Sequence, residues 1–277
     1  MKKFRLFFLL ILVTTLVSCS SDDSSNDTEE VVSNHFPLTV GNSWTYNNET
    51  TYQDGASTNS QETLTVESTS EEQGVTYYKL ESDASINEKG FFTGILTAGS
   101  LIMADNQLIY NGELSVDLSG FGLDLDNLSI PLNNIIVFDA EANSGENLTQ
   151  INDVITRNVN LPQVGTVPFT IEYNLRTVQN EFLNSYTVNE EEFQDVLSAG
   201  IIVNLEISVS LSGFQIPILQ SQDAIQMTNY YADNVGLIKS ETSINYDFEE
   251  LNFPNIPSIP DFSMEETQEI ETYIVAE

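Results

Sequence analysis

ETLTVEST, at residues 62–69, contains the pattern on which the fold assignment depends. Leu64 and Val66 alternate with polar residues, and this period of two is typical of a strand with one buried and one exposed face. The same alternation, rich in β-branched and aromatic residues, occurs in VTYYKLES at 75–82 and in TIEYNLRTV at 170–178. These segments predict antiparallel strands, because antiparallel sheets commonly leave one face in water.

Short turn signals separate the predicted strands, and no window of 15 residues carries a helical stripe of apolar side chains. The signals are QDG (53–55), EEQG (71–74), NEKG (87–90) and SAG (198–200). Glycine next to polar residues favours tight turns, which join strands that follow one another in the chain. The sequence therefore predicts an all-β fold, a single antiparallel meander that forms a half-open barrel or a strongly curved sheet. We expect at most one or two short helices.

One segment occurs twice in the chain. ELSVDLSGFGLDL at 113–125 and EISVSLSGFQIPI at 206–218 are identical at seven of thirteen positions, and three more exchange Leu for Ile. Two interpretations remain open. The copies are either two neighbouring strands of one sheet with similar environments, or a pair of apolar flaps at the mouth of a cavity. In the second case the ligand-binding residues are Phe121, Leu123, Phe214 and Ile216.

The first 18 residues have the layout of a secretory signal peptide. Three basic residues precede an apolar stretch, residues 6–17, that ends beside small side chains. A membrane-spanning helix needs roughly 20 apolar residues. The stretch is shorter, so we expect residues 1–18 to direct export and then to be removed.

LVSC, at residues 16–19, resembles the lipobox of bacterial lipoproteins, which implies that Cys19 receives a diacylglyceryl group and becomes the first mature residue. An ordinary signal peptide with an incidental cysteine is the alternative. Residues 19–35 then form a lipidated, disordered acidic tether, and residues 36–277 a single β domain. SSDDSSNDTEE in this tether resembles the export signal of surface-exposed lipoproteins of some Gram-negative bacteria, which implies an outer-membrane location facing the exterior. The segment is equally typical of a plain flexible linker.

Charge excludes one class of partner. Removal of the leader takes away three of eight basic residues and no acidic one, which leaves five bases against 42 acids and a net charge of −37. Such a surface repels phosphate backbones and anionic lipid, so nucleic acid is not an expected partner. Membrane attachment must therefore come from the lipid on Cys19. Because no second cysteine exists, the fold cannot contain a disulfide bond.

Three segments carry a resemblance to a family. FPLTVGNSWTY (36–46), YTVNEEEFQDVL (186–197) and YYADNVGLIKSE (230–241) resemble signposts of a group of uncharacterised β-rich bacterial lipoproteins. That group is in turn distantly similar to the half-barrel fold of outer-membrane lipoprotein carriers and receptors. The resemblance implies that the first segment enters the opening strand, the second turns into a central strand, and the third leads through Val-Gly to a lysine.

Candidate catalytic residues are few. His35 is the sole histidine and lies in the predicted tether, so a His-based triad or an HExxH zinc site is not expected. Lipidation consumes Cys19, and the glycine-rich phosphate loops are absent. LDLDN at 123–127 resembles a fragment of a calcium loop but lacks the glycine and distal glutamate of the EF-hand. We therefore expect no enzyme, no cofactor and no metal site.

Two functions remain after these exclusions. The first is a non-enzymatic, lipid-anchored surface lipoprotein whose half-barrel binds an apolar or amphipathic ligand, such as a lipid or an acyl chain. The alternative is an interaction or assembly module of a surface protein complex, working through an exposed sheet edge or loop. The first predicts a cavity with an excess of inward-facing apolar residues, whereas the second predicts a filled core and a protein partner.

Overall fold

The structure, a computed structural model, describes residues 34–116, 128–161, 165–211, 213–250 and 259–276. The described residues all belong to one compact unit, Ser33–Glu277, called the β domain below. Cys19, Phe121, Leu123 and the LDLDN segment lie outside the described residues.

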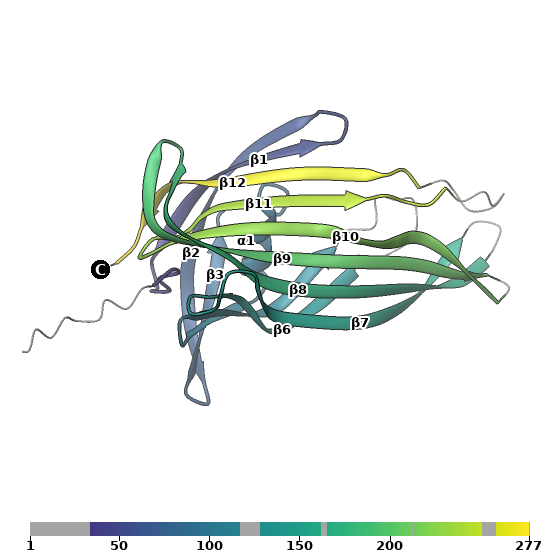
Figure 1. Cartoon of the computed structure of the whole chain (residues 1–277), viewed down its shortest axis with the longest axis horizontal. Coiled ribbons are helices and arrows are strands. Elements are labelled where there is room, and N and C mark those ends of the chain that lie inside the picture. The colour runs from purple at the N-terminus through teal and green to yellow at the C-terminus, as the bar shows by residue number, and fades with distance from the viewer. Residues whose placement is uncertain (1–33, 117–127, 162–164, 212, 251–258, 277) are drawn as a thin grey trace, which may run out of the picture. The chain divides into compact units, whose positions relative to one another are not determined.

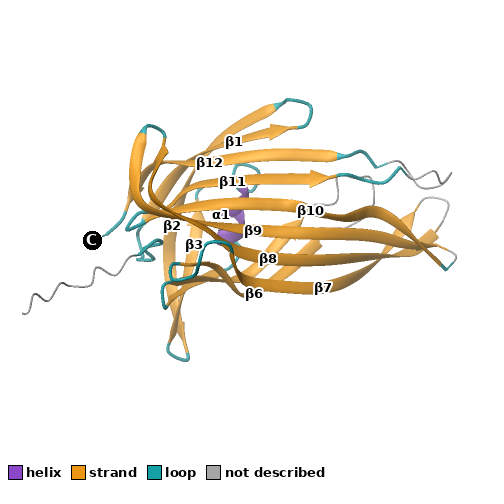
Figure 2. Cartoon of the chain, in the orientation of Figure 1, coloured by secondary structure: helices purple, strands orange, loops and turns teal. Residues whose placement is uncertain are grey.

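Twelve strands and one short helix make up the described part of the β domain (Figures 1 and 2). In chain order the elements are β1 (Ser43–Tyr52), β2 (Ser57–Glu72), β3 (Val75–Ser82), α1 (Phe91–Thr97), β4 (Ser100–Ala104), β5 (Gln107–Val116), β6 (Leu128–Asp139), β7 (Glu146–Leu161), β8 (Gly165–Val188), β9 (Glu191–Leu211), β10 (Phe214–Ala232), β11 (Gly236–Tyr246) and β12 (Phe262–Ile274).

All twelve strands belong to one antiparallel sheet with the order β6-β5-β4-β3-β2-β1-β12-β11-β10-β9-β8-β7. Strands that follow one another in the chain are neighbours, except β6 and β7, which form the two edges of the sheet. In addition, the first strand, β1, pairs with the last strand, β12. That pairing joins the two ends of the meander in the middle of the sheet. The predicted single antiparallel meander is confirmed, as is the limit of one or two short helices.

The two edge strands, β6 and β7, face each other across a seam. Side chains bridge one end of it: Ile136 N donates to Thr149 Oγ1 at 3.0 Å, and Thr177 Oγ1 donates to Ile136 O at 2.7 Å. Asp139 N donates to Gln179 Oε1 at 3.1 Å. Among the described residues no backbone ladder joins β6 to β7. The sheet is therefore a barrel closed except at one seam, which confirms the predicted half-open barrel.

The alternation read from the sequence sets the inner face of the barrel. Leu64 and Val66 are buried on β2, as are Trp44 and Tyr46 on β1. Trp44 stacks on Phe36 with ring centroids 5.2 Å apart, and its Nε1 donates to Val235 O at 2.6 Å. These aromatic residues fill one end of the barrel, here called the closed end.

Helix α1 lies inside the curl of the sheet, where Phe92, Ile95 and Leu96 are buried. It has only seven residues, includes Gly94, and begins at Gly90 without a side-chain cap. A helix this short is marginal by itself in water, so its packing inside the barrel must stabilise it.

Two sequence expectations are wrong in detail. Residues 198–200, suggested as a turn, lie within β9. Small residues are needed there because β8 bulges between Gln179 and Phe182, and Ser198 Oγ accepts a hydrogen bond from Glu181 N in the bulge. The repeated segments are not neighbouring strands either, since one ends β5 and the other ends β9 and enters β10.

The chain enters the β domain at the closed end. Asn34 N donates to Asp233 Oδ1 at 2.7 Å, and His35 is buried edge-on against Phe138. Burial lowers the His35 pKa, although Asp233 and Asp195 act to raise it. The last two residues of the expected tether thus pack against the domain. From here β1 runs ten residues, about 33 Å, to the opposite end of the barrel.

Candidate functional site

A cavity opens at the end of the barrel opposite the closed end. Its first part, here called the apolar compartment, has a volume of about 560 Å³. Apolar side chains of five elements dominate its lining: Phe91, Val116, Ile225, Ile244, Tyr246, Phe262 and Met264. Exposed Gln53, Pro260 and Asp261 stand at its rim, whereas Ile225 and Ile244 are buried, so the compartment opens toward the rim.

A polar compartment of about 680 Å³ adjoins the first, because both are lined by Tyr52, Phe91, Ser115 and Met264. Its other lining residues include Thr50, Asn59, Ser60, Glu88, Lys89, Glu113 and Glu266. The two compartments together present an apolar surface near the rim and hydrogen-bonding groups beside α1. Such a combination suits an amphipathic molecule.

Below the cavity, the buried carboxylate of Glu62 organises the loop that leads into α1. Its Oε1 accepts hydrogen bonds from Gly90 N (2.7 Å), Thr93 Oγ1 (2.5 Å), Gln268 Nε2 (2.8 Å) and Asn48 Nδ2 (3.2 Å), and its Oε2 accepts one from Ser82 Oγ (2.6 Å). Five donors replace the water that a buried charge would lose. Glu62 thereby ties β1, β2, β3, β12 and α1 together.

Glu266, on β12, binds the backbone N–H of the residue that follows Gly90 in the chain. Its Oε1 accepts from Phe91 N at 2.5 Å and its Oε2 from Thr50 Oγ1 at 3.2 Å. Burial raises the Glu266 pKa, the two hydrogen bonds oppose that rise, and the nearby charge of Glu62 adds to it. Two carboxylates therefore hold the first N–H groups of α1 at the floor of the polar compartment.

The raised pKa of Glu266 predicts a pH-dependent contribution to stability. Folded Glu266 binds a proton more readily than the unfolded residue, so the free energy of unfolding falls as pH rises from about 4.5 through the folded pKa. Glu266→Gln removes this titration and keeps an oxygen for Phe91 N–H. We expect the stability of the variant, relative to the wild type, to increase with pH and then to level off. Urea unfolding of both proteins from about pH 5 to pH 8 checks this, and a difference that declines with pH contradicts it.

Glu62 was missed from the sequence, although a signal for it exists. In ETLTVEST it has the same phase as Leu64 and Val66, so it is an acid on the buried face of a strand. Charged residues are almost never fully buried without partners. A glutamate in phase with the apolar residues is therefore evidence for an internal polar network.

The residues proposed from the repeat lie elsewhere. Phe214 is 73% exposed at the start of β10, and Ile216 is half-buried on the same strand. Neither lines the two compartments described above. Their role as flaps, together with Phe121 and Leu123, stays a prediction.

Lys239, from the third signpost segment, contacts Glu241 and Glu269 at 3.0 and 3.2 Å. Partial burial lowers its pKa, but the hydrogen bonds to both carboxylates outweigh this and the net shift is upward. The ion pairs give the lysine a structural role on β11.

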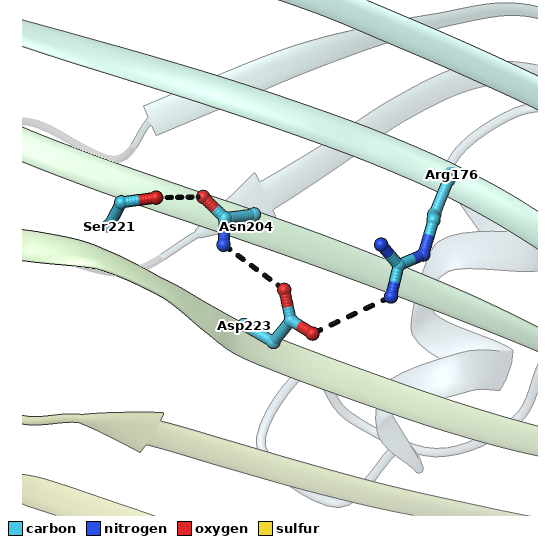
Figure 3. Close-up of polar contacts among 4 residues, drawn as sticks. All are labelled: Arg176, Asn204, Ser221 and Asp223. Atoms are coloured by element: carbon cyan, nitrogen blue, oxygen red, sulfur yellow. Dashed lines mark hydrogen bonds and ion pairs between the residues drawn. The ribbon is translucent and has the colours of Figure 1, made fainter.

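A second polar group lies on the outer face of the sheet (Figure 3). Ser221 Oγ donates to Asn204 Oδ1 at 2.8 Å, Asn204 Nδ2 donates to Asp223 Oδ1 at 3.1 Å, and Arg176 Nη2 lies 3.6 Å from Asp223 Oδ2. Arg176 faces outward because Leu175 and Thr177, on either side of it, are buried. The arginine and aspartate side chains are 39% and 38% exposed, so their ion pair is worth roughly 0–1 kcal/mol.

Two further properties concern the described residues alone. None of their helical segments has the length and apolarity required to cross a membrane. Within the same residues, no group of three or more histidine, cysteine, aspartate or glutamate side chains is arranged to hold a metal ion.

No family model and no curated protein matches the chain. Three solved structures match the chain over most of its length. A Bacteroides fragilis protein described as exported, with a YmcC-like fold, is 12% identical with a TM-score of 0.30, over 86% of this chain and 98% of that one. A Parabacteroides distasonis protein described as a lipoprotein is 12% identical with a TM-score of 0.32, over 87% and 99%.

The third structure is a LolA superfamily protein of Nitrosomonas europaea, 10% identical with a TM-score of 0.18, over 87% of this chain and 88% of that one. Exported proteins, lipoproteins and LolA-like folds are also the kinds of protein that the three signpost segments resemble. At such low identities and TM-scores the likeness does not extend to a ligand or an activity.

Proposed function

We propose that the chain is a lipid-anchored, non-enzymatic surface lipoprotein whose β domain binds an apolar or amphipathic ligand in the cavity at the barrel mouth. The observation that carries the proposal is the apolar compartment of about 560 Å³, which lies within the ordinary range for small-molecule sites. A barrel used only as an assembly module would have no need to leave this volume open. The lipobox-like segment ending at Cys19 supports the anchor.

The direction of entry follows from the same geometry. Asn34 and His35 hold the incoming chain at the closed end, while Gln53 and Asp261 stand at the rim of the cavity. The ligand therefore enters at the end of the domain opposite the point where the tether joins it. Binding leaves the tether attachment undisturbed.

Binding of N-phenyl-1-naphthylamine, a neutral apolar dye that fluoresces on burial, tests the proposal. The protein is the mature chain with Cys19→Ser, which needs no detergent. Met264 lines both compartments, so Met264→Trp narrows both and should weaken dye binding by about tenfold or more. Glu265→Trp is the matched control, because Glu265 is the next residue on β12 and points to the exposed face.

Equal dye affinity of the Met264→Trp and Glu265→Trp proteins would contradict this site. A wild-type protein that binds no dye, and from which native mass spectrometry recovers no apolar adduct, would contradict the proposed function itself. In that case the surface-complex module becomes the better interpretation.

A further inference from the structure

Four buried polar side chains form a row across the inner face of the sheet. Asn48 on β1 pairs with Gln268 on β12, Gln268 pairs with Ser240 on β11, and Ser240 pairs with Asn229 on β10. All four are at most 4% exposed. We call them the polar row. Side chains that face inward from adjacent strands at one level lie side by side, so the row is continuous.

Most of the hydrogen-bonding capacity of the polar row is unused. Asn48 Nδ2 and Gln268 Nε2 both donate to Glu62 Oε1, and this fixes the orientation of the two amides because a carboxylate only accepts. Their oxygens point away from Glu62. These two oxygens, Ser240 Oγ and both polar atoms of the Asn229 side chain have no partner among the described residues. Buried polar groups in proteins are nearly always paired, so a water molecule or a ligand is the expected partner of these atoms.

The polar row lies one step deeper in the barrel than the floor of the cavity. Thr50 and Glu266, which line the polar compartment, are cross-strand partners two residues further toward the mouth on β1 and β12. Two residues along a strand span about 7 Å. A molecule that passes this floor reaches the polar row next.

The segment that begins α1 separates the polar row from the cavity. The Gly90 backbone is so close to the row that an added Cβ would clash with Gln268 Nε2 and lie 3.1 Å from Asn48 Oδ1. The backbone N–H of Gly90 donates to Glu62, and that of Phe91 donates to Glu266. The helix that follows is short and contains Gly94. To reach the polar row, a ligand must displace these two hydrogen bonds and the buried side chains Phe92, Ile95 and Leu96 of α1. A helix this short has little stability of its own to oppose that movement.

We propose that the polar row is the inner part of the ligand site and binds the hydroxyl-bearing end of an uncharged amphiphile when α1 moves aside. The ligand then lies with its polar end inward and its apolar chain toward Tyr246 and Phe262 at the mouth. Unpaired donors and acceptors are mixed in the row, and a hydroxyl group supplies both. An anionic end would meet Glu62 and Glu266 instead. The inference rests on the proposed function, whose ligand it specifies.

Competition against N-phenyl-1-naphthylamine tests the ligand class. The probes share one acyl chain: 1-monomyristoylglycerol, myristate and methyl myristate. We expect the mature Cys19→Ser protein to bind the monoglyceride at least about tenfold more tightly than the other two. Hydrogen exchange in residues 90–97 should become faster when the monoglyceride is bound.

Asn229→Leu combined with Ser240→Ala tests the residues. These substitutions remove unpaired buried groups, and leucine keeps the branched shape of asparagine, so the fold should persist. Monoglyceride affinity should fall by about tenfold or more, with methyl myristate affinity unchanged. If the double variant does not fold, Ser240→Ala alone removes one hydroxyl and should still weaken monoglyceride binding selectively.

Three results would overturn the inference and leave the proposed function intact. They are myristate binding as tight as monoglyceride binding, unchanged monoglyceride affinity in the variants, and a bound structure in which the polar row contacts only ordered water. A wild-type protein that binds neither the dye nor any of the three probes would instead contradict the proposed function.

Discussion

Glu62→Leu should lower the free energy of unfolding by roughly 3–5 kcal/mol, because five buried donors lose the carboxylate that accepts from them. Leucine has a similar volume but no acceptor. For a domain of this size the loss corresponds to a fall in melting temperature of roughly 10 °C. Thermal unfolding followed by circular dichroism measures it.

Glu67→Leu is the control for that variant. Glu67 is on the same strand but exposed, and its replacement removes the same negative charge. An exposed substitution away from special features changes stability by about 0.5 kcal/mol or less. If the free energies of unfolding of the two variants differ by less than about 1 kcal/mol, Glu62 is not the centre of the internal network.

Trp44→Ala should destabilise the β domain by roughly 3–5 kcal/mol, the usual cost of truncating a fully buried aromatic side chain. The variant loses the stack on Phe36 and the hydrogen bond to Val235 O. The variant also loses the close contact with the backbone of Gly236, where an added Cβ would lie 3.0 Å from Trp44 Nε1. Denaturant unfolding followed by far-ultraviolet circular dichroism suits this variant, since the sole tryptophan is gone.

Two other substitutions, each with a smaller expected loss of stability, serve as comparisons for Trp44→Ala. Trp44→Phe keeps an aromatic ring but leaves Val235 O without its donor. This variant should therefore lose clearly less free energy of unfolding than Trp44→Ala. Phe214→Ala removes an aromatic ring that is 73% exposed and should change stability by about 0.5 kcal/mol or less. A Trp44→Ala protein as stable as Phe214→Ala would show that the closed end does not hold the barrel together.

Much of the fold follows from local sequence patterns. The alternation at Leu64 and Val66 correctly identifies inward-facing side chains. The three signpost segments also occupy the expected places, since they lead into β1, the β8–β9 turn and the β10–β11 turn. Period-two patterns succeed because the geometry of a single strand fixes which residues share a face.

Local patterns were less reliable where a neighbouring strand decides the conformation. The small residues at 198–200 resemble a turn but continue β9, because they face a bulge in β8. One of the two interpretations of the repeat was a pair of adjacent strands, yet β5 and β9 lie far apart in the strand order. Similar side-chain patterns indicate similar environments, and they do not specify a shared partner.

The sequence by itself determined the strand period, the meander and the strongly acidic surface. Only the tertiary structure decided the site, because the site depends on which distant residues become neighbours. Asn48 and Gln268 are 220 positions apart and meet only when β1 pairs with β12. Glu62 becomes a buried acceptor, and the cavity remains open beside α1, because that long-range pairing curls the sheet around the helix. Strand periodicity describes the faces of one strand, whereas closure of the barrel determines what those faces enclose.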